Sequence, residues 1–158
     1  MQIIGVDVTS NDSTPVHSLG QLYDDDNGKR YRYVKLLNET ATVTGAAGDA
    51  VGYLAAAASA TEQFTVVTDL TDAALKPICA GLLNATIVGA TGTAEYVWVQ
   101  CGGPATANQN IAGTTPADGD GLMLSTTDLT LTLATAVDDP ICAYASDDSA
   151  DLVILACV

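Results

Sequence analysis

The sequence predicts an all-β protein, a sandwich or barrel of short antiparallel strands. Runs rich in Val, Ile, Thr, Leu and Tyr recur along the 158 residues, separated by Gly, Asn, Asp and Pro. That spacing is typical of all-β domains. Stretches with the hydrophobic period of a long amphipathic helix are hard to find. We therefore expect less than about a fifth of the residues in helices, against the usual ~30–35%.

The expected strands, in chain order, are 2–8, 19–23, 30–37, 40–44, 50–56, 62–67, 78–83, 95–101, 121–126, 129–134, 141–145 and 151–157. The run LTLTLAT alternates cleanly, which places Leu129, Leu131 and Leu133 on one face. Two segments, YLAAAASA and TDAAL, have the composition of a helical turn, the second with Thr71 as N-cap and Pro77 as its limit. Neither is long enough to change the fold class.

Four of the five basic residues lie within the hairpin-like segment QLYDDDNGKRYRYVKLL. The pair Asn27-Gly28 between two β-like runs predicts a tight turn, since both residues tolerate positive φ. On the return strand, alternation predicts one face made of Tyr31, Tyr33 and Lys35, and an opposite face made of Arg30, Arg32, Val34 and Leu36.

Two interpretations of this charged hairpin stay open. The preceding acids, Asp24 to Asp26, neutralise the bases across the hairpin, at a few tenths to about 1 kcal/mol per pair. Alternatively, the strand docks a protein partner, because Tyr and Arg are enriched at interface hot spots. The candidate partner-binding residues are Lys29, Arg30, Tyr31, Arg32, Tyr33 and Lys35.

An internal repeat organises the rest of the chain. Near the middle the order is GDAV, KPICAG and EYVWVQC, and near the end it is GDGL, DPICAY and DLVILAC. Independent use of the same residue types in unrelated β-strands would also explain the repeated segments. If it is a duplication, Cys79 matches Cys142 and Cys101 matches Cys157. The single domain 1–158 would then comprise an N-terminal segment and hairpin, 1–44, and two similar β-units, 45–101 and 117–158, joined by a loop-rich linker.

The cysteines lie in apolar strands, where a Cys behaves as a small hydrophobe, so we expect four buried free thiols. A disulfide between strands is the alternative, and zinc ranks last because no C-x-x-C or nearby His accompanies them. The lone His17 is expected at the surface, without a metal or catalytic partner. Asp24 to Asp26 do not match a calcium loop, since Gly28 falls one position too early. No cofactor or metal is expected.

Composition restricts the function. The net charge of −14 and pI near 4.1 argue against nucleic-acid binding. No apolar run is long enough to span a membrane, and the N-terminus does not resemble a secretory signal, so we expect folding in a cytoplasm and reduced thiols. Charged residues are only 15%, below the usual ~25%, which suits a surface that meets other protein. No nucleophile-elbow or phosphate-loop motif is present, so we expect no enzyme.

Four segments together resemble the small decoration, or cement, proteins of tailed-bacteriophage heads: NGKRYRYVKLLN, KPICAGLLNATI, TAEYVWVQCGGPA and ADGDGLMLSTTDLTLTLATAVDDPICAYA. The resemblance covers about residues 20–157 and includes no catalytic signature. It implies a structural virion protein, made in the host cytoplasm, that binds the outer surface of the assembled head and stabilises the major capsid protein lattice. It also implies contacts with copies of itself, as a trimer or dimer on a capsid symmetry axis. The alternative is a carbohydrate-binding or adhesive β-module of a phage fibre or cell surface.

Overall fold

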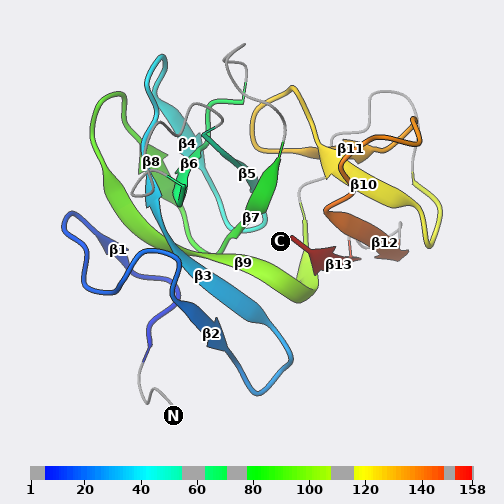
Figure 1. Ribbon diagram of the computed structural model, residues 1–158, viewed down its shortest axis with the longest axis horizontal. Helices are drawn as coiled ribbons and strands as arrows, with labels where there is room; N and C mark the ends of the chain where they lie inside the picture. Colours follow the sequence, from blue (N-terminus) through cyan, green and yellow to red (C-terminus); the bar gives the residue numbers. More distant parts are fainter. Residues whose placement is uncertain (1–5, 55–62, 71–77, 108–115, 148–151, 158) are drawn as a thin grey trace.

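The computed structural model describes residues 6–54, 63–70, 78–107, 116–147 and 152–157 (Figure 1). These residues form strands and no helix, which confirms the all-β prediction, and they include no helix able to cross a membrane. The strands are β1 (Asn11–Asp12), β2 (Leu22–Asp24), β3 (Arg30–Leu36), β4 (Val43–Gly45), β5 (Ala50–Tyr53), β6 (Thr65–Val67), β7 (Cys79–Leu83), β8 (Ile87–Gly89), β9 (Glu95–Thr106), β10 (Gly121–Leu124), β11 (Leu131–Leu133), β12 (Ala143–Asp147) and β13 (Leu152–Ala156).

Five strands close into a small barrel. β3 pairs with β9, β9 with β7, β7 with β5 and β5 with β6, all antiparallel, and the parallel pair β6–β3 closes the ring. Closure gives each of these five strands a hydrogen-bonded neighbour on both sides. Apolar side chains of these strands, together with Ile87 of β8, form one buried cluster in the interior: Val34, Leu36, Val51, Val66, Ala80, Leu83, Ile87, Val97 and Val99.

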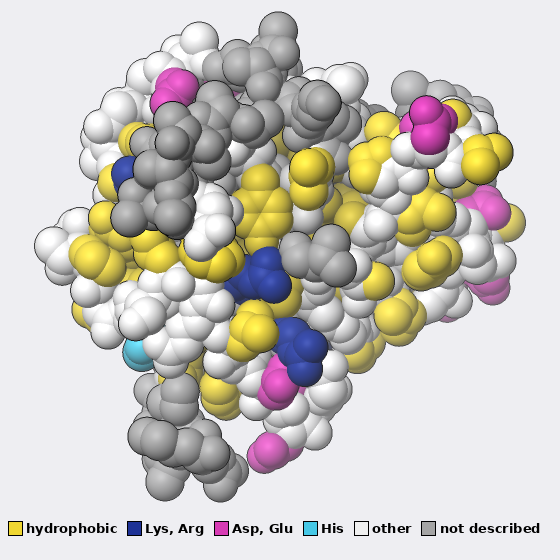
Figure 2. All heavy atoms as spheres, in the orientation of Figure 1, with side chains coloured by type: hydrophobic (Ala, Val, Ile, Leu, Met, Phe, Trp, Pro, Cys, Tyr) yellow, Lys and Arg dark blue, Asp and Glu magenta, His cyan; other side chains and the backbone are white. Residues whose placement is uncertain are grey.

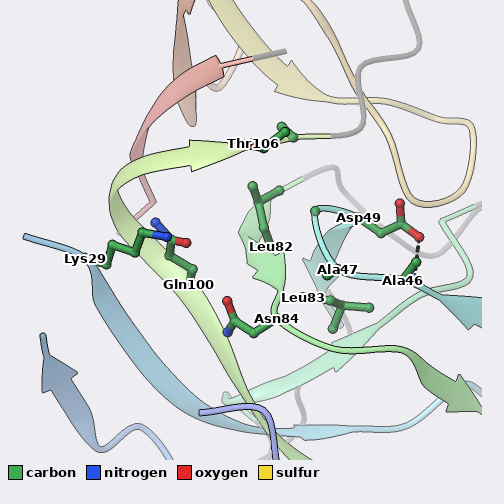
Figure 3. Close-up of a pocket in the computed structure, with 11 residues that line it drawn as sticks. Lys29, Ala46, Ala47, Asp49, Leu82, Leu83, Asn84, Gln100 and Thr106 are labelled. Atoms are coloured by element: carbon green, nitrogen blue, oxygen red, sulfur yellow. Dashed lines mark hydrogen bonds between the residues drawn. The ribbon is translucent and has the colours of Figure 1, made fainter. Parts of the chain in front are cut away.

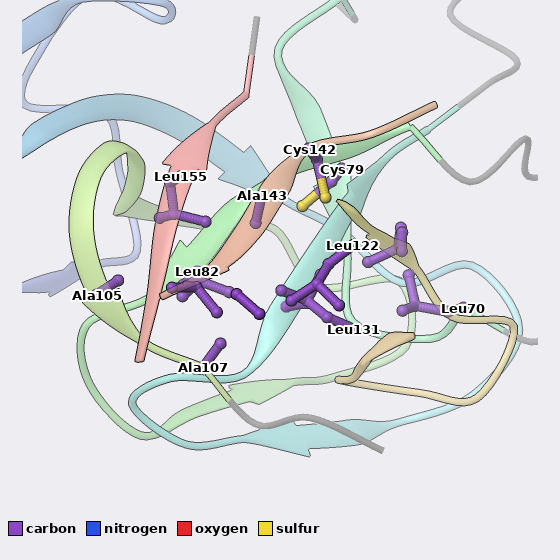
Figure 4. Close-up of a cluster of buried hydrophobic side chains, with 14 of the residues drawn as sticks. Leu70, Cys79, Leu82, Ala105, Ala107, Leu122, Leu131, Cys142, Ala143 and Leu155 are labelled. Atoms are coloured by element: carbon purple, nitrogen blue, oxygen red, sulfur yellow. The ribbon is translucent and has the colours of Figure 1, made fainter. Parts of the chain in front are cut away.

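A second sheet grows from the long strand β9. Beyond the barrel, β9 pairs with β13, and the sheet continues through β12 and β10 to β11. Its inner face packs on the outside of the barrel strands β5 and β7, burying a second core (Figure 4). That core comprises Ala50, Val67, Leu70, Cys79, Leu82, Ala105, Ala107, Leu122, Leu124, Leu131, Cys142, Ala143, Ala145, Val153 and Leu155.

A third, aromatic cluster lies on the barrel face turned away from the second sheet. Tyr31 and Tyr33 of β3 pack there with Trp98 of β9, covered by residues of the N-terminal segment 6–21 and by β2. The ring of His17 lies edge-on against Tyr33 and Trp98, with centroids 5.1 and 5.2 Å away. His17 is therefore partly buried against aromatic rings, where we expected a surface position.

The strand predictions were mostly right, with informative exceptions. Residues 6–8 of the expected strand 2–8 form no strand, and the N-terminal strand is instead the short β1, paired with β9. β8 was missed; it is only three residues long and pairs with β4 in a separate two-stranded sheet. Leu129 was wrongly placed with Leu131 and Leu133: its φ is 68°, so the chain turns there and β11 begins later.

Three further expectations concerned the linker, the segments of helical composition and the internal repeat. Strand β9 runs to Thr106, so the first part of the expected linker is sheet. The segments with helical composition fall largely on 55–62 and 71–77, outside the described residues. The duplication stays a prediction, although two turns have matching geometry. Asp49 and Asp120 each accept the backbone N–H three residues earlier, at 2.7 and 2.8 Å, and each follows a glycine with φ of 91°.

Truncation of one central side chain tests the second core. Leu82 of β7 is 1% exposed, so Leu82→Ala should lower the free energy of unfolding by about 2–5 kcal/mol, through lost burial and the cavity left behind. Leu22→Ala is the matched control, because Leu22 on the edge strand β2 is 47% exposed. Urea unfolding of both variants measures this, and equal losses would contradict the assigned packing.

Candidate partner-binding surface

The β2–β3 hairpin forms as predicted, but its turn differs in detail. Gly28 has φ of 77°, whereas Asn27 does not have positive φ. The turn spans Asp25 to Lys29, closed by the Asp25 N–H to the Lys29 carbonyl at 2.9 Å. The Asp25 carboxylate accepts the N–H groups of Asn27 and Lys29, both at 2.9 Å, and so builds the longer turn.

Two of the four hairpin bases are already engaged within the chain. Arg30 makes a two-pronged contact with Asp24, at 2.7 Å from Nε and 3.1 Å from a terminal nitrogen. Both side chains are more than half exposed, so the pair contributes little stability. Arg32 is half-buried and donates to the Tyr53 hydroxyl, and its Nε is buried without a hydrogen-bond partner among the described residues. The expectation that acids neutralise bases across the hairpin therefore holds for Arg30.

The two candidate tyrosines lie inside the protein. Tyr31 is 5% exposed and Tyr33 fully buried, both in the aromatic cluster. The predicted faces of β3 are confirmed, since Val34 and Leu36 point into the barrel and the tyrosines point outward beneath the N-terminal segment. Of the six candidates, the four bases therefore have side chains that a partner could reach. Arg30 is exposed, and the other three are partly exposed.

Two cavities flank the hairpin tip. One, of about 600 Å³, is lined by Lys29, Asp49, Leu82, Asn84 and Gln100 among others, and Figure 3 shows the Lys29 and Gln100 side chains close together at one end. The amides of Asn84 and Gln100 donate to backbone carbonyls there. The other cavity, of about 470 Å³, lies between the hairpin and the β9–β13 pair, and its lining includes Arg30, Cys101 and Cys157.

The outer face of β12 and β13 is apolar and exposed. Tyr144 lies opposite Ile154 in the antiparallel pair, and the two side chains are 46% and 44% exposed. Leu152, 40% exposed, lies two residues before Ile154 on the same face of β13. The side chain of Ile141, 46% exposed, lies over Gly121, which pairs with Tyr144. Figure 2 shows hydrophobic side chains across the part of the molecule where Figure 1 places β10 to β13, and Lys and Arg side chains near the centre of the same view.

Sequence analysis missed this apolar face, although a signal was present. In β13, Val153 and Leu155 are buried in the second core while Leu152 and Ile154 face outward. A strand that is apolar on both faces is typical of a position covered on both sides. We call the surface formed by Ile141, Tyr144, Leu152 and Ile154 the β12–β13 face.

The structure leaves all four cysteines free, as predicted, with Cys157 partly exposed and the other three buried. It also brings three of them together, which the sequence did not indicate. The sulfurs of Cys79, Cys142 and Cys157 all lie within 4.8 Å of one another. Thiol hydrogen bonds from Cys157 and then Cys79 lower the pKa of Cys142, and the same contacts raise the pKa values of both donors. These three side chains could hold a metal ion.

Comparison with known proteins finds no matching family model, no similar curated protein and no similar solved structure.

The buried phenol of Tyr31 predicts a loss of stability at high pH. Burial, and then the charge of Asp25, raise the pKa of Tyr31 to about 12, whereas an unfolded tyrosine titrates near 10. Between about pH 10 and pH 12 the unfolded chain releases this proton and the folded chain keeps it, so the free energy of unfolding should fall with pH. Urea unfolding across this pH range should show a shallower fall for Tyr31→Phe. Tyr144→Phe, at an exposed site, is the control; an unchanged slope in Tyr31→Phe would contradict the assignment.

Proposed function

We propose that this chain is a structural virion protein that binds the outer surface of an assembled phage head and stabilises its major capsid protein lattice. The sequence resemblance supplies the class of protein. The observation that carries the proposal is the β12–β13 face, because exposed apolar side chains that adjoin one another mark protein interaction sites. Copies of the chain, as a trimer or dimer on a capsid symmetry axis, are part of the same proposal.

The charge distribution supports this assignment. A net charge of −14 keeps many copies apart and soluble before assembly. The bases, in contrast, concentrate at one hairpin beside the second sheet, where Arg30 lies opposite Gly102 of β9 and Ala156 of β13 lies opposite the same glycine. An apolar patch with charged groups at its edge has the composition of a protein interface, in which polar groups surround an apolar centre.

The carbohydrate-binding alternative has no specific observation in its favour. Sugar recognition of that kind was expected to use clustered exposed aromatics. The chain has six Tyr, one Trp and one Phe, and Tyr144 is the exposed one among them. Trp98, Tyr31 and Tyr33 instead form the buried aromatic cluster.

A charge on the β12–β13 face should release the protein from heads. Ile154→Asp places a carboxylate where the capsid surface would cover it, at a cost of several kcal/mol. At about 1.4 kcal/mol per tenfold, that corresponds to at least about a hundredfold weaker binding. Co-sedimentation with expanded heads assembled from the capsid protein of its own phage measures the bound fraction. Val88→Asp is the matched control, since Val88 is 47% exposed on the separate β4–β8 sheet. Wild-type occupancy by a folded Ile154→Asp protein would contradict docking through this face.

Charge reversal at the hairpin tip tests the predicted basic site separately. The double change Lys29→Glu and Arg30→Glu leaves the buried tyrosines and the half-buried Arg32 in place, so the fold should persist. Binding to heads should weaken, and its dependence on salt should become smaller, because exposed charge pairs are screened by ions.

Lys76→Glu, at the remaining basic residue of the chain, changes the net charge by −2, half the change of −4 in the hairpin variant, and shows how strongly net charge alone affects binding. If the hairpin variant and Lys76→Glu bind heads equally well, the hairpin bases have no docking role and their contacts within the chain account for them.

A further inference from the structure

We propose that Cys79, Cys142 and Cys157 form a thiolate site for a soft d¹⁰ metal ion, Zn²⁺ or Cu⁺, which ties the second sheet to the barrel. The proposal is independent of the capsid assignment and concerns a site that the sequence ranked last. Thiolates select these soft ions over hard oxygen-seeking cations such as Mg²⁺ and Ca²⁺.

The sulfur positions fit a shared ion. A zinc–thiolate bond is about 2.3 Å long, so two thiolates on one tetrahedral zinc lie about 3.8 Å apart. The sulfurs of Cys157 and Cys79 are 3.7 Å apart, and all three lie within 4.8 Å of one another. Figure 4 shows the sulfurs of Cys79 and Cys142 turned toward each other at one end of the second core. Only a small contraction is needed for three metal–sulfur bonds.

Backbone pairing holds the three ligands in place. Cys79 begins β7, Cys142 immediately precedes β12 and Cys157 immediately follows β13. The N–H of Ala156 donates to the Cys142 carbonyl at 2.9 Å, and the N–H of Cys157 donates to the Cys101 carbonyl at 3.1 Å. Because the sheet fixes these backbones, the site is preorganised before an ion arrives. The ligands come from both the barrel and the second sheet.

The surroundings provide access and charge balance. Cys157 lines the cavity of about 470 Å³ beside the hairpin, so an ion can enter and a fourth ligand can come from solvent. Three thiolates leave a net charge of −1 with Zn²⁺ and −2 with Cu⁺. The guanidinium of Arg32 lies within electrostatic range of Cys157 and Cys101 and offsets part of that charge. Its buried Nε lacks a hydrogen-bond partner among the described residues.

The metal-free full-length protein, reduced and chelator-treated, tests the proposal. Titration with Zn²⁺, and separately with Cu⁺, should give one ion per chain and a rise in the thermal midpoint, since binding to the folded state alone stabilises it. Co²⁺ as a spectroscopic substitute for Zn²⁺ should show thiolate charge-transfer absorption. The metal content of the untreated protein, measured by mass spectrometry, identifies the occupant, because selection between metals depends on availability and geometry as well as affinity.

Serine variants identify the ligands. Cys157→Ser, at the partly exposed position, should weaken binding at least tenfold and reduce the thermal shift at a given metal concentration. Cys101→Ser is the matched control, because Cys101 is buried and outside the group of three, and it should bind as the wild type does. An unchanged affinity in Cys157→Ser, or no binding of either ion to wild type, would overturn the proposal. So would two free thiols rather than four in the untreated, denatured protein, because a disulfide would then use two of the sulfurs.

Discussion

The change of direction of β9 at its middle is the constraint on which the rest of the structure depends. Its first half pairs with β3 and β7 to close the barrel, and its second half pairs with β13 to begin the second sheet. The β3–β9 register shifts between Arg30 and Tyr31, so Cys101 is an extra residue, a bulge that bends the strand. Gly103 follows with φ of 81°, and a Cβ there would lie 2.2 Å from the Gly28 carbonyl oxygen. The bulge and the glycine thus let one continuous strand pair in both the barrel and the second sheet.

The same bend explains why the bases gather at the hairpin. The tip of the β2–β3 hairpin lies directly against the bend, with Gly28 beside Gly103, so a cavity opens on either side. Lys29 lines one cavity and Arg30 the other. Asp25 shapes the turn and Asp24 pairs with Arg30, so the acids before the bases first determine the hairpin geometry. The geometry of the turn therefore positions the charged groups of Lys29 and Arg30 before any partner is present.

Local patterns predicted what local physics decides. Alternation in β3 correctly assigned Tyr31 and Tyr33 to one face and Val34 and Leu36 to the other, and Asn27-Gly28 correctly marked the hairpin. The alternation in β3 could not show that both faces of the strand are covered, because the N-terminal segment and the other barrel strands that cover them are distant in sequence. The prediction for Leu129 was wrong because a clean alternating pattern does not reveal a positive φ. The meeting of Cys79, Cys142 and Cys157 depends on sheet order, which no sequence spacing encodes.

The two faces of β13 contribute differently to the stability of the folded chain and to its association with other surfaces. Inward, Val153 and Leu155 complete the second core, and the strand is followed directly by Cys157, one of the three clustered cysteines. Outward, Leu152 and Ile154 gain only part of their hydrophobic free energy from folding, because they stay 40% and 44% exposed in the isolated chain. Apolar area that folding leaves in water contributes its hydrophobic free energy only when another surface covers it. The inner face thus accounts for stability of the monomer, and the outer face is the part of the strand that association would stabilise.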